Sequence, residues 1–340
     1  MLVIDAATIN SRDKKIIMEP PFGIIRSIFA ESCFDCQWKH SPISIGCLSI
    51  RINIDKLDCV RDYIRMPELP EVESVLRSLC DCTPSLLGRV VNSVNILLKT
   101  LVSGGHTEDF STELKGMTFS TISRHGKYLV FKMTKPEICG YESFFIVHLR
   151  MTGRLFLVPQ EQCIERYTRM SIMLDAGLAL RFDDPRKFGR VWLVDEPDAV
   201  LSALGPDALF VSPEIFISRI SNYQRQIKPL LLNQSFLAGI GNIYADESLF
   251  RAGIHPLTSS RSLSCIDIER LYCAIHAVLE EAVEANGANI DGVFGEGDFI
   301  VSVYGRGGKP CPTCGSAIVK IRVGQRGTHL CPVCQPFCGR

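Results

Sequence analysis

Four cysteines near the carboxyl end restrict the possible folds of this chain more than any other feature. Two residues separate Cys311 from Cys314, two more separate Cys331 from Cys334, and sixteen residues lie between the pairs. Two such pairs can bring four thiolates to the corners of a tetrahedron, which is the geometry of a closed structural zinc site. We therefore expect these four residues to bind one structural Zn²⁺.

The residues between the cysteine pairs predict a β-hairpin over 316–323 and 327–330, with Gly324 at the turn. The net charge of the chain is zero, but the segment from Val301 onward carries six Lys or Arg and no Asp or Glu. A hairpin held rigid by zinc can carry an arginine into a nucleic-acid groove at low entropic cost. Ribbons that only brace a fold or bind protein are the open alternative at this point.

The cysteine content and the amino terminus indicate a cytoplasmic protein. The chain has 15 cysteines, no apolar run long enough for a membrane span, and no secretory signal. Free or metal-bound cysteines in a reducing compartment are therefore expected. Cys33 and Cys36 form a further pair without a second half at matching spacing, so a chance pair is the preferred interpretation.

The length of the chain suggests two or three domains, and its pattern of apolar residues predicts an α+β protein. With 340 residues and 46% hydrophobic content, the chain can bury a sizeable core. Runs rich in β-branched and aromatic residues predict a β-sandwich. The expected strands are 90–98, 128–133, 144–149, 155–158, 171–174, 178–182 and 191–194.

Helical periodicity is expected before and after these strands. The expected short helices are 71–79, 213–220, 228–232 and 242–252, and the longest helix is 264–286. Ser264 and Asp267 resemble a capping box at the start of the longest helix, and Gly287 marks its end. Residues 287–299 are rich in Gly and Asp and predict a mobile loop.

Several short motifs together resemble the formamidopyrimidine-DNA glycosylase family. They occur in family order and, with the zinc module, span residues 66–334. The motifs are MPELPEVE at 66–73, GKYL at 126–129, HLRMTG at 148–153, DPRKFG at 184–189, IKP at 227–229, GIGNIYADE at 239–247, VYGR at 303–306 and QRGT at 325–328. Each string is weak alone, but their combination is highly specific.

The resemblance implies an α+β multidomain architecture. An N-terminal β-sandwich flanked by helices is expected over 66–200, a helix–two-turn–helix domain over 201–299, and a C-terminal zinc-finger hairpin over 300–340. Residues 1–65 lie outside the resemblance and are expected to be an extension that is not part of the functional enzyme. The expected protein is a monomer of the bacterial cytosol that binds damaged double-stranded DNA between its two lobes.

The resemblance also implies a set of catalytic residues. Pro67 resembles the nucleophile, whose amine attacks C1′ of the damaged nucleotide and forms an iminium that permits strand cleavage. Glu68 resembles the acid that protonates the departing sugar or base, and burial would raise its pKa. Lys127 resembles the proton donor and phosphate partner of β-elimination. Arg326 resembles the hairpin-tip residue of the second elimination.

Further residues are expected to hold the DNA by family analogy. Met151 and Phe188 resemble apolar wedges that fill the space of an extruded nucleotide, and Arg186 would pair with the widowed base. Phe188 lies in the DPRKFG motif, which has turn-forming residues at both ends. This position argues against burial of its side chain in the core. The residues expected to grip the flanking phosphates are Asn242, at the start of a helix, with His148, Lys228, Tyr304 and Arg326.

The chain departs from the family pattern at three places. Tyr167 lies in the string RYTR, where relatives often have a histidine, and is the expected DNA contact there. Lys187 replaces a frequent arginine. The loop 287–299, which would cover the extruded base, differs from the best-known family pattern.

The leading 65 residues conflict with the expected nucleophile. While they are attached, the Pro67 nitrogen is a tertiary amide whose lone pair is delocalised into the carbonyl, so it cannot attack. The preferred interpretation is that translation begins at Met66 and that methionine removal exposes Pro67. Processing of the longer chain is a second interpretation, and a lesion-binding protein without lyase activity is a third.

The predicted function is a bifunctional DNA glycosylase and AP lyase for oxidised purines, 8-oxoguanine and formamidopyrimidines, acting by β,δ-elimination. The nearest alternative is an endonuclease VIII-like enzyme for oxidised pyrimidines. Leu69 favours the purine branch, because the sister branch usually has glycine there. A non-catalytic DNA-binding protein is the alternative from another class, and the combination of Glu68 with Lys127 argues against it.

Overall fold

The computed structural model describes residues 43–45, 48–50, 66–138, 140–288 and 297–337. The chain forms two compact units, Met1–Val60 and Arg61–Arg340. In the first unit, strand β1 (Ile43–Ile45) pairs antiparallel with β2 (Leu48–Ile50), a short hairpin that the sequence pattern did not predict. Cys33 and Cys36 lie outside the described residues, as does most of the loop predicted at 287–299.

Helix α3 (Leu69–Asp81) opens the described part of the second unit. Pro70 is compatible with the first helical turn, where no backbone donor is needed, so the helix begins two residues before the predicted 71–79. A carboxylate oxygen of Glu71 accepts a hydrogen bond from the backbone nitrogen of Glu68 at 2.9 Å. This bond fixes the direction in which the chain enters the helix.

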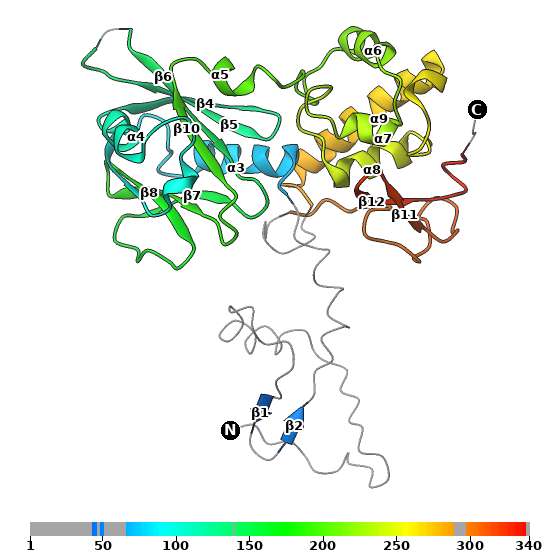
Figure 1. Cartoon of the computed structure of the whole chain (residues 1–340), viewed down its shortest axis with the longest axis horizontal. Coiled ribbons are helices and arrows are strands. Elements are labelled where there is room, and N and C mark those ends of the chain that lie inside the picture. The colour runs from blue at the N-terminus through cyan, green and yellow to red at the C-terminus, as the bar shows by residue number, and fades with distance from the viewer. Residues whose placement is uncertain (1–42, 46–47, 51–65, 139, 289–296, 338–340) are drawn as a thin grey trace. The chain divides into compact units, whose positions relative to one another are not determined.

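Two four-stranded antiparallel sheets follow and confirm the predicted sandwich (Figure 1). One sheet has the order β10-β6-β5-β4, and the other has the order β3-β8-β9-β7. The strands are β3 (Val91–Ile96), β4 (Thr118–His125), β5 (Tyr128–Thr134), β6 (Glu142–His148), β7 (Arg154–Pro159), β8 (Thr168–Leu174), β9 (Leu178–Asp183) and β10 (Arg190–Val194). One apolar core joins side chains from both sheets.

Strand β4 and helix α4 (Thr107–Leu114) were not predicted. Both present mostly polar or small side chains, and only Phe119, Phe110 and Leu114 among their large apolar residues are buried. The register of β4 comes from its pairing with β5, in which Phe119 lies opposite Met133. Such pairing depends on a tertiary contact that local propensity does not contain.

Helices α6 (Pro213–Ser221), α7 (Ile227–Leu231), α8 (Asn242–Arg251) and α9 (Cys265–Glu284) form the second lobe, beside the sandwich in Figure 1. The short helix α5 (Asp198–Leu201) lies next to the sandwich, after β10, and short 3₁₀ turns occur at Lys99–Leu101 and Ser260–Ser262. The predicted capping box of α9 is present, with Ser264 and Asp267 bonded reciprocally. No helix in the described part of the chain is long and apolar enough to cross a membrane.

The predicted hairpin between the cysteine pairs is also present. Strand β11 (Val319–Val323) pairs with β12 (Arg326–Leu330), and Gly324 adopts a left-handed φ of 58° in the tight turn between them. Sandwich, helical lobe and hairpin together confirm the α+β class predicted from the sequence.

A buried ion-pair network joins the two lobes. The guanidinium of Arg124 on β4 lies 2.5 Å from a carboxylate oxygen of Asp207 and 2.8 Å from one of Glu73 on α3. Asp207 also accepts the backbone N–H of Gly126 at 2.7 Å. Because the Arg124 side chain is only 1% exposed, its positive charge must be compensated by these partners.

Replacing Asp207 with Ala is expected to destabilise the protein by about 3–5 kcal/mol, because a buried arginine then loses a charged partner. Chemical denaturation followed by circular dichroism measures the change. The matched control is Glu142→Gln, which removes the partially exposed ion pair with Lys132 and should cost less than about 1 kcal/mol. Equal effects of the two variants would contradict a structural role for the Arg124 network.

Candidate active site

Glu68 lies at the amino-terminal end of helix α8, where its carboxylate accepts three backbone hydrogen bonds. The donors are the N–H groups of Gly241 at 2.8 Å, Ile243 at 2.9 Å and Tyr244 at 3.3 Å. A Cβ atom at Gly241 would lie 2.2 Å from Cδ of Glu68, so only glycine permits this approach. The contact joins residues 173 positions apart in sequence, one in each lobe.

Burial raises the pKa of Glu68 from 4.5 to about 7. Loss of hydration is the largest cause, and the negative charge of Glu71 adds to it. The charge of Lys127 and the N–H groups of Ile243 and Tyr244 act in the opposite direction. A carboxyl with this pKa exchanges its proton near neutral pH and is suited to general acid catalysis.

Lys127 lies in the turn between β4 and β5 and is buried next to the two glutamates. Burial lowers the pKa of Lys127, and the positive charge of Arg326 lowers it further, while Glu68 and Glu71 oppose this change. Gly126 has a left-handed φ of 58° and lies close to Ala238 of the helical lobe. Asp207 therefore positions this turn from the second lobe through its bond to the Gly126 N–H.

Pro67 is buried immediately before Glu68. Its nitrogen is joined to the carbonyl of Met66 in the 340-residue chain, so it is an amide in this structure. The structure thus brings together Pro67, Glu68 and Lys127, within the electrostatic influence of Arg326. Arg326 itself is exposed at the first position of β12.

The amino terminus of α8, which the sequence predicts to point toward a phosphate, is occupied by a carboxylate of the protein itself. Glu68 takes backbone donors that had been expected to grip a phosphate. Gly241, not Asn242, is the cap residue of this helix. The Asn242 side-chain nitrogen donates to the Gly327 carbonyl at 3.1 Å, and its oxygen is buried with no hydrogen-bond partner in the described region.

Lys228 is completely buried, and its ammonium holds the zinc hairpin against the helical lobe. It lies 2.7 Å from a carboxylate oxygen of Asp246 and donates to Thr328 Oγ1 at 2.7 Å and to the Gly327 carbonyl at 3.2 Å. Asp246 also accepts the N–H of His329 at 2.8 Å. Direct phosphate binding by Lys228 would therefore require it to leave these partners.

Tyr304 is also buried, with its ring edge against His329 at a centroid distance of 5.4 Å. Its backbone N–H and those of Ser302 and Val303 donate to the carboxylate of Glu247 at 2.8–3.0 Å. Burial raises the pKa of Glu247 to about 7. This carboxylate fixes the segment that leads from the helical lobe into the zinc module.

His148 ends strand β6 as a neutral imidazole. Its Nδ1 accepts the backbone N–H of Arg150 at 2.9 Å, which leaves the proton on Nε2. Burial and the nearby charges of Arg150 and Lys127 lower its pKa to about 3. His148 can therefore offer an uncharged N–H donor throughout the physiological pH range.

The expected wedge residues lie in two turns at one end of the sandwich. Phe188 is 45% exposed, in agreement with the prediction against core burial, and the Arg186 guanidinium lies 4.9 Å from its ring centre. Met151 is half-buried. Tyr167 is also half-buried, with the guanidinium of Arg169 6.0 Å from its ring centre.

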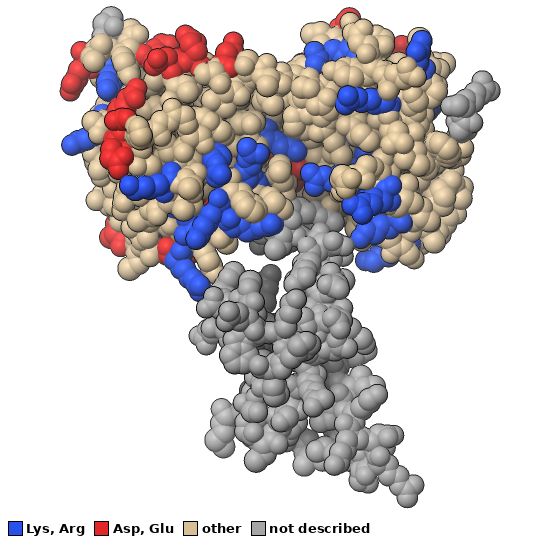
Figure 2. Space-filling model, in the orientation of Figure 1, with Lys and Arg blue, Asp and Glu red and all other residues tan. Residues whose placement is uncertain are grey.

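The zero net charge of the chain conceals a separation of charge on its surface. Figure 2 shows Lys and Arg side chains gathered on a face shared by both lobes, while Asp and Glu collect mainly along the outer edge of the sandwich. A positive face of this kind attracts an anionic polymer.

The four predicted zinc ligands lie together. All four sulfur atoms fall within 4.8 Å of one another, with Cys311 and Cys334 at 3.8 Å and Cys314 and Cys331 at 3.4 Å. Tetrahedral Zn²⁺ with bonds of about 2.3 Å requires sulfur–sulfur distances of about 3.8 Å. The cluster therefore fits one structural zinc, as predicted.

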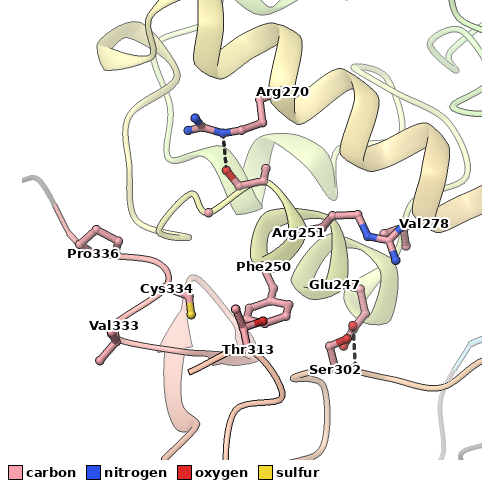
Figure 3. Close-up of a pocket in the computed structure, with 12 residues that line it drawn as sticks. Glu247, Phe250, Arg251, Arg270, Val278, Ser302, Thr313, Val333, Cys334 and Pro336 are labelled. Atoms are coloured by element: carbon pink, nitrogen blue, oxygen red, sulfur yellow. Dashed lines mark hydrogen bonds between the residues drawn. The ribbon is translucent and has the colours of Figure 1, made fainter. Parts of the chain in front are cut away.

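An open hollow of about 780 Å³ is lined by residues of α8, α9 and the zinc module (Figure 3). Its three charged lining side chains are engaged with the protein. Glu247 binds the Ser302 N–H, Arg270 donates to the Ala252 carbonyl at 2.6 Å, and Arg251 pairs with Glu281 at 2.6 Å. The hollow contains none of the predicted catalytic residues.

Glu71 is the main site residue that sequence reasoning did not single out. Its Oε1 accepts the Tyr244 hydroxyl at 2.5 Å and the Ala288 N–H at 2.9 Å, next to the loop after α9. A Cβ at Gly287 would lie 2.6 Å from the same oxygen. The residue is visible in the MPELPEVE string, but only the fold shows which groups it joins.

Three family models match the chain in succession. The formamidopyrimidine-DNA glycosylase N-terminal domain matches residues 66–191, and the H2TH domain of that glycosylase matches residues 204–292. The zinc finger found in FPG and IleRS matches residues 308–336. Together they cover most of the chain.

Individual relatives agree with these matches. A formamidopyrimidine-DNA glycosylase of Desulfitobacterium hafniense is 42% identical over 283 residues, covering 79% of this chain and 100% of the relative. That of Symbiobacterium thermophilum is 41% identical over 283 residues, covering 80% and 90%. The Lactococcus lactis FPG (MutM), solved with a FAPY-dG-containing DNA, has a TM-score of 0.72 and 33% identity, covering 79% of this chain and 100% of that one.

Replacing Cys331 with Ser is expected to remove the zinc, since one of four thiolates is lost. Changes outside the ligand set already weaken metal binding by roughly 10–100-fold, so loss of a ligand should exceed that. Atomic emission on the purified protein should show about one zinc per chain before the change and almost none after it. Cys163→Ser, an exposed thiol outside the cluster, is the control that should keep the metal. Full zinc retention in the Cys331 variant would contradict the assignment.

Proposed function

The chain belongs to the formamidopyrimidine-DNA glycosylase family, and from that premise we propose that it is a bifunctional DNA glycosylase and AP lyase of base excision repair. Its proposed substrates are oxidised purines, 8-oxoguanine and formamidopyrimidines, in double-stranded DNA. The observation that carries the proposal is the buried Glu68 carboxyl with a pKa of about 7, which follows Pro67 in the chain and interacts electrostatically with the buried Lys127. Binding alone would not require this combination.

The proposed nucleophile is the Pro67 nitrogen, once it is a free secondary amine. Its lone pair attacks C1′ of the damaged nucleotide as the bond to the base breaks, and the amine releases its proton. Cleavage of the C1′–O4′ bond, with protonation of O4′, then opens the sugar ring and gives the iminium linkage. The iminium withdraws electrons from the sugar, which makes the proton on C2′ acidic and permits elimination of the 3′ phosphate. Burial of Pro67 next to Glu68 supports this assignment because it places the amine beside a proton donor.

Glu68 is the proposed proton donor to the departing sugar or base. Its carboxyl is held in one orientation by the three N–H groups of α8, so little reorganisation accompanies proton transfer. Lys127, whose pKa is lowered by burial, is the proposed partner for proton transfer and phosphate binding during β-elimination. Arg326, exposed at the hairpin tip, is proposed to serve the second elimination.

DNA binding is proposed for the positive face shared by the lobes. His148 would donate its Nε2 proton to a phosphate, while Met151, Arg186 and Phe188 would enter the duplex and Tyr167 would contact it from the neighbouring turn. The Lactococcus lactis relative was solved in complex with a FAPY-dG-containing DNA, which supports such a partner. The bonds of Asn242 and Lys228 to the hairpin and the burial of Tyr304 against His329 support a role in positioning the zinc hairpin on the DNA.

The proposal divides the chain into a catalytic domain at 66–200, a helix–two-turn–helix domain at 201–299 and a zinc finger at 300–340. It requires that residues 1–65 be absent from the active enzyme, because they block the Pro67 nitrogen. The three successive family matches, at residues 66–191, 204–292 and 308–336, support this division. A monomer acting in the cytoplasm is part of the same proposal.

The oxidised-pyrimidine branch is the second candidate function. Leu69, which is fully buried, favours the purine branch. A Cβ at Gly239 would lie 2.5 Å from Cδ1 of Leu69, so this side chain fills the space beside the glycine-rich turn. Duplexes with 8-oxoguanine or thymine glycol would separate the two branches.

Borohydride reduction on an 8-oxoguanine duplex is expected to trap a covalent adduct only when Pro67 is the first residue. The matched control is the intact 340-residue chain, with both amino termini confirmed by sequencing. Reduction converts the iminium into a stable amine that is detected on a denaturing gel.

An adduct with the intact chain would identify another amine, such as Lys127, as the nucleophile and would overturn the assignment of Pro67. No adduct from either form, on 8-oxoguanine or thymine glycol, would leave a DNA-binding protein without lyase activity.

Replacing Glu68 with Gln in the Pro67-initiated form is expected to slow base release by about 100-fold or more, because the proton donor is lost. Cleavage at a preformed abasic site should be affected much less, since no base leaves there. Single-turnover assays on the two duplexes measure the difference. Equal losses on both substrates would indicate a structural role for Glu68.

The rate of base release should fall as the pH rises through about 7, the pKa of Glu68. Above that value only the shrinking protonated fraction can donate, so the rate falls about tenfold for each pH unit. Acidic pH opposes the reaction by protonating the Pro67 amine. A single-turnover rate that stayed constant from pH 7 to 9 would contradict proton donation by Glu68.

A further inference from the structure

The carboxyl end of strand β9 contacts both turns that carry the proposed wedge residues. Phe182 is the last buried apolar residue of this strand, and Asp184 follows directly after the strand. A Cβ at Gly153, after the Met151 turn, would lie 2.8 Å from Cζ of Phe182. A Cβ at Gly189, after Phe188, would lie 2.4 Å from the same atom. Both turns are therefore packed against one aromatic ring.

The carboxylate of Asp184 binds both turns as well. Its Oδ1 accepts the hydroxyl of Thr152 at 2.5 Å and the N–H of Arg186 at 3.1 Å, and its Oδ2 accepts the N–H of Gly189 at 2.8 Å. Asp184 is fully buried, and no ion pair to it occurs within the described residues. Its buried charge is therefore stabilised by hydrogen bonds from the two turns, and each is costly to lose.

Both turns also hold a non-glycine residue in the left-handed region. Arg150, directly before Met151, has a φ of 58°, and Lys187, directly before Phe188, has a φ of 63°. Such conformations persist where the surroundings fix them. The Arg190 guanidinium adds to this restraint by donating to the carbonyls of Phe188 at 3.1 Å and Gly189 at 2.7 Å.

We propose that Asp184, through Thr152, is a positioning residue that sets the spacing between the Met151 and Phe188 wedges. It lies beneath both wedges and acts through the turns that carry them. With the spacing fixed, both side chains can enter the duplex together as the damaged nucleotide leaves the stack. This inference rests on the proposed function, because it assigns Asp184 to the base-extrusion step of that reaction.

Thr152 offers a test because its hydroxyl is the one side-chain link from the Met151 turn to Asp184 within the described structure. Thr152→Val keeps the shape but removes the hydroxyl, while Thr152→Ser keeps the hydroxyl. Thr152→Ala serves as a second variant, because it places no methyl group against the carboxylate. Melting temperatures of the Pro67-initiated proteins establish that each variant is folded.

Single-turnover base release is then measured on two duplexes. In one, 8-oxoguanine is paired with cytosine, and in the other it lies opposite a tetrahydrofuran site, where no base pair must be broken. Thr152→Val is expected to be about tenfold slower on the paired duplex, from loss of one hydrogen bond to a charged group. The decrease in rate should be much smaller on the unpaired duplex. Thr152→Ser should release the base at nearly the unsubstituted rate on both duplexes.

Equal losses on both duplexes would show a general structural defect, and a Thr152→Val rate equal to the unsubstituted rate would show no role. Either result would overturn the inference while leaving the proposed function intact. An unsubstituted enzyme that released no base from either duplex would instead overturn the proposed function, and this inference with it.

Discussion

The contact on which the site depends is the carboxylate of Glu68 against the amino terminus of helix α8. A residue next to the proposed nucleophile is held by backbone donors from the other lobe, at 2.8–3.3 Å. This contact places Pro67 at the junction of the lobes and gives Glu68 the buried environment that raises its pKa. The Arg124–Asp207 pair stabilises the same junction and aligns the turn of Lys127. The arrangement of the two lobes and the raised pKa of Glu68 are therefore consequences of the same contacts.

The sequence predicted the features that depend on local patterns. The spacing of Cys311, Cys314, Cys331 and Cys334 identified the zinc ligands, and the apolar periodicity located α9 and seven of the strands, while β4 was missed because its order comes from pairing with β5. The motifs identified Glu68 and Lys127, but not the partners of each side chain. Lys228 illustrates the limit, because its motif suggests a phosphate ligand whereas the structure buries it against Asp246.

Polar contacts from helix α8 hold the zinc hairpin and the segment before it against the helical lobe. Asp246 binds the Lys228 ammonium and the His329 N–H, Asn242 binds the Gly327 carbonyl, and Glu247 binds the segment at 302–304. All three side chains come from helix α8, whose amino terminus also holds Glu68. A displacement of this helix would therefore move Arg326 and the proposed acid together. Such coupling fits the proposed reaction, in which Glu68 and Arg326 act one after the other on the same nucleotide.

The neutral state of His148 has a consequence for the ionic-strength dependence of DNA binding. Each Lys or Arg that neutralises a phosphate releases condensed counterions, and the logarithm of affinity falls with that of salt concentration at a slope of about −0.9 per contact. The pKa of His148 is about 3, so its imidazole is neutral at physiological pH. Its N–H group can therefore bind a phosphate without releasing counterions. The buried Lys228 also contributes little, because its charge is already paired with Asp246. The number of phosphates contacted would therefore exceed the number inferred from a salt titration.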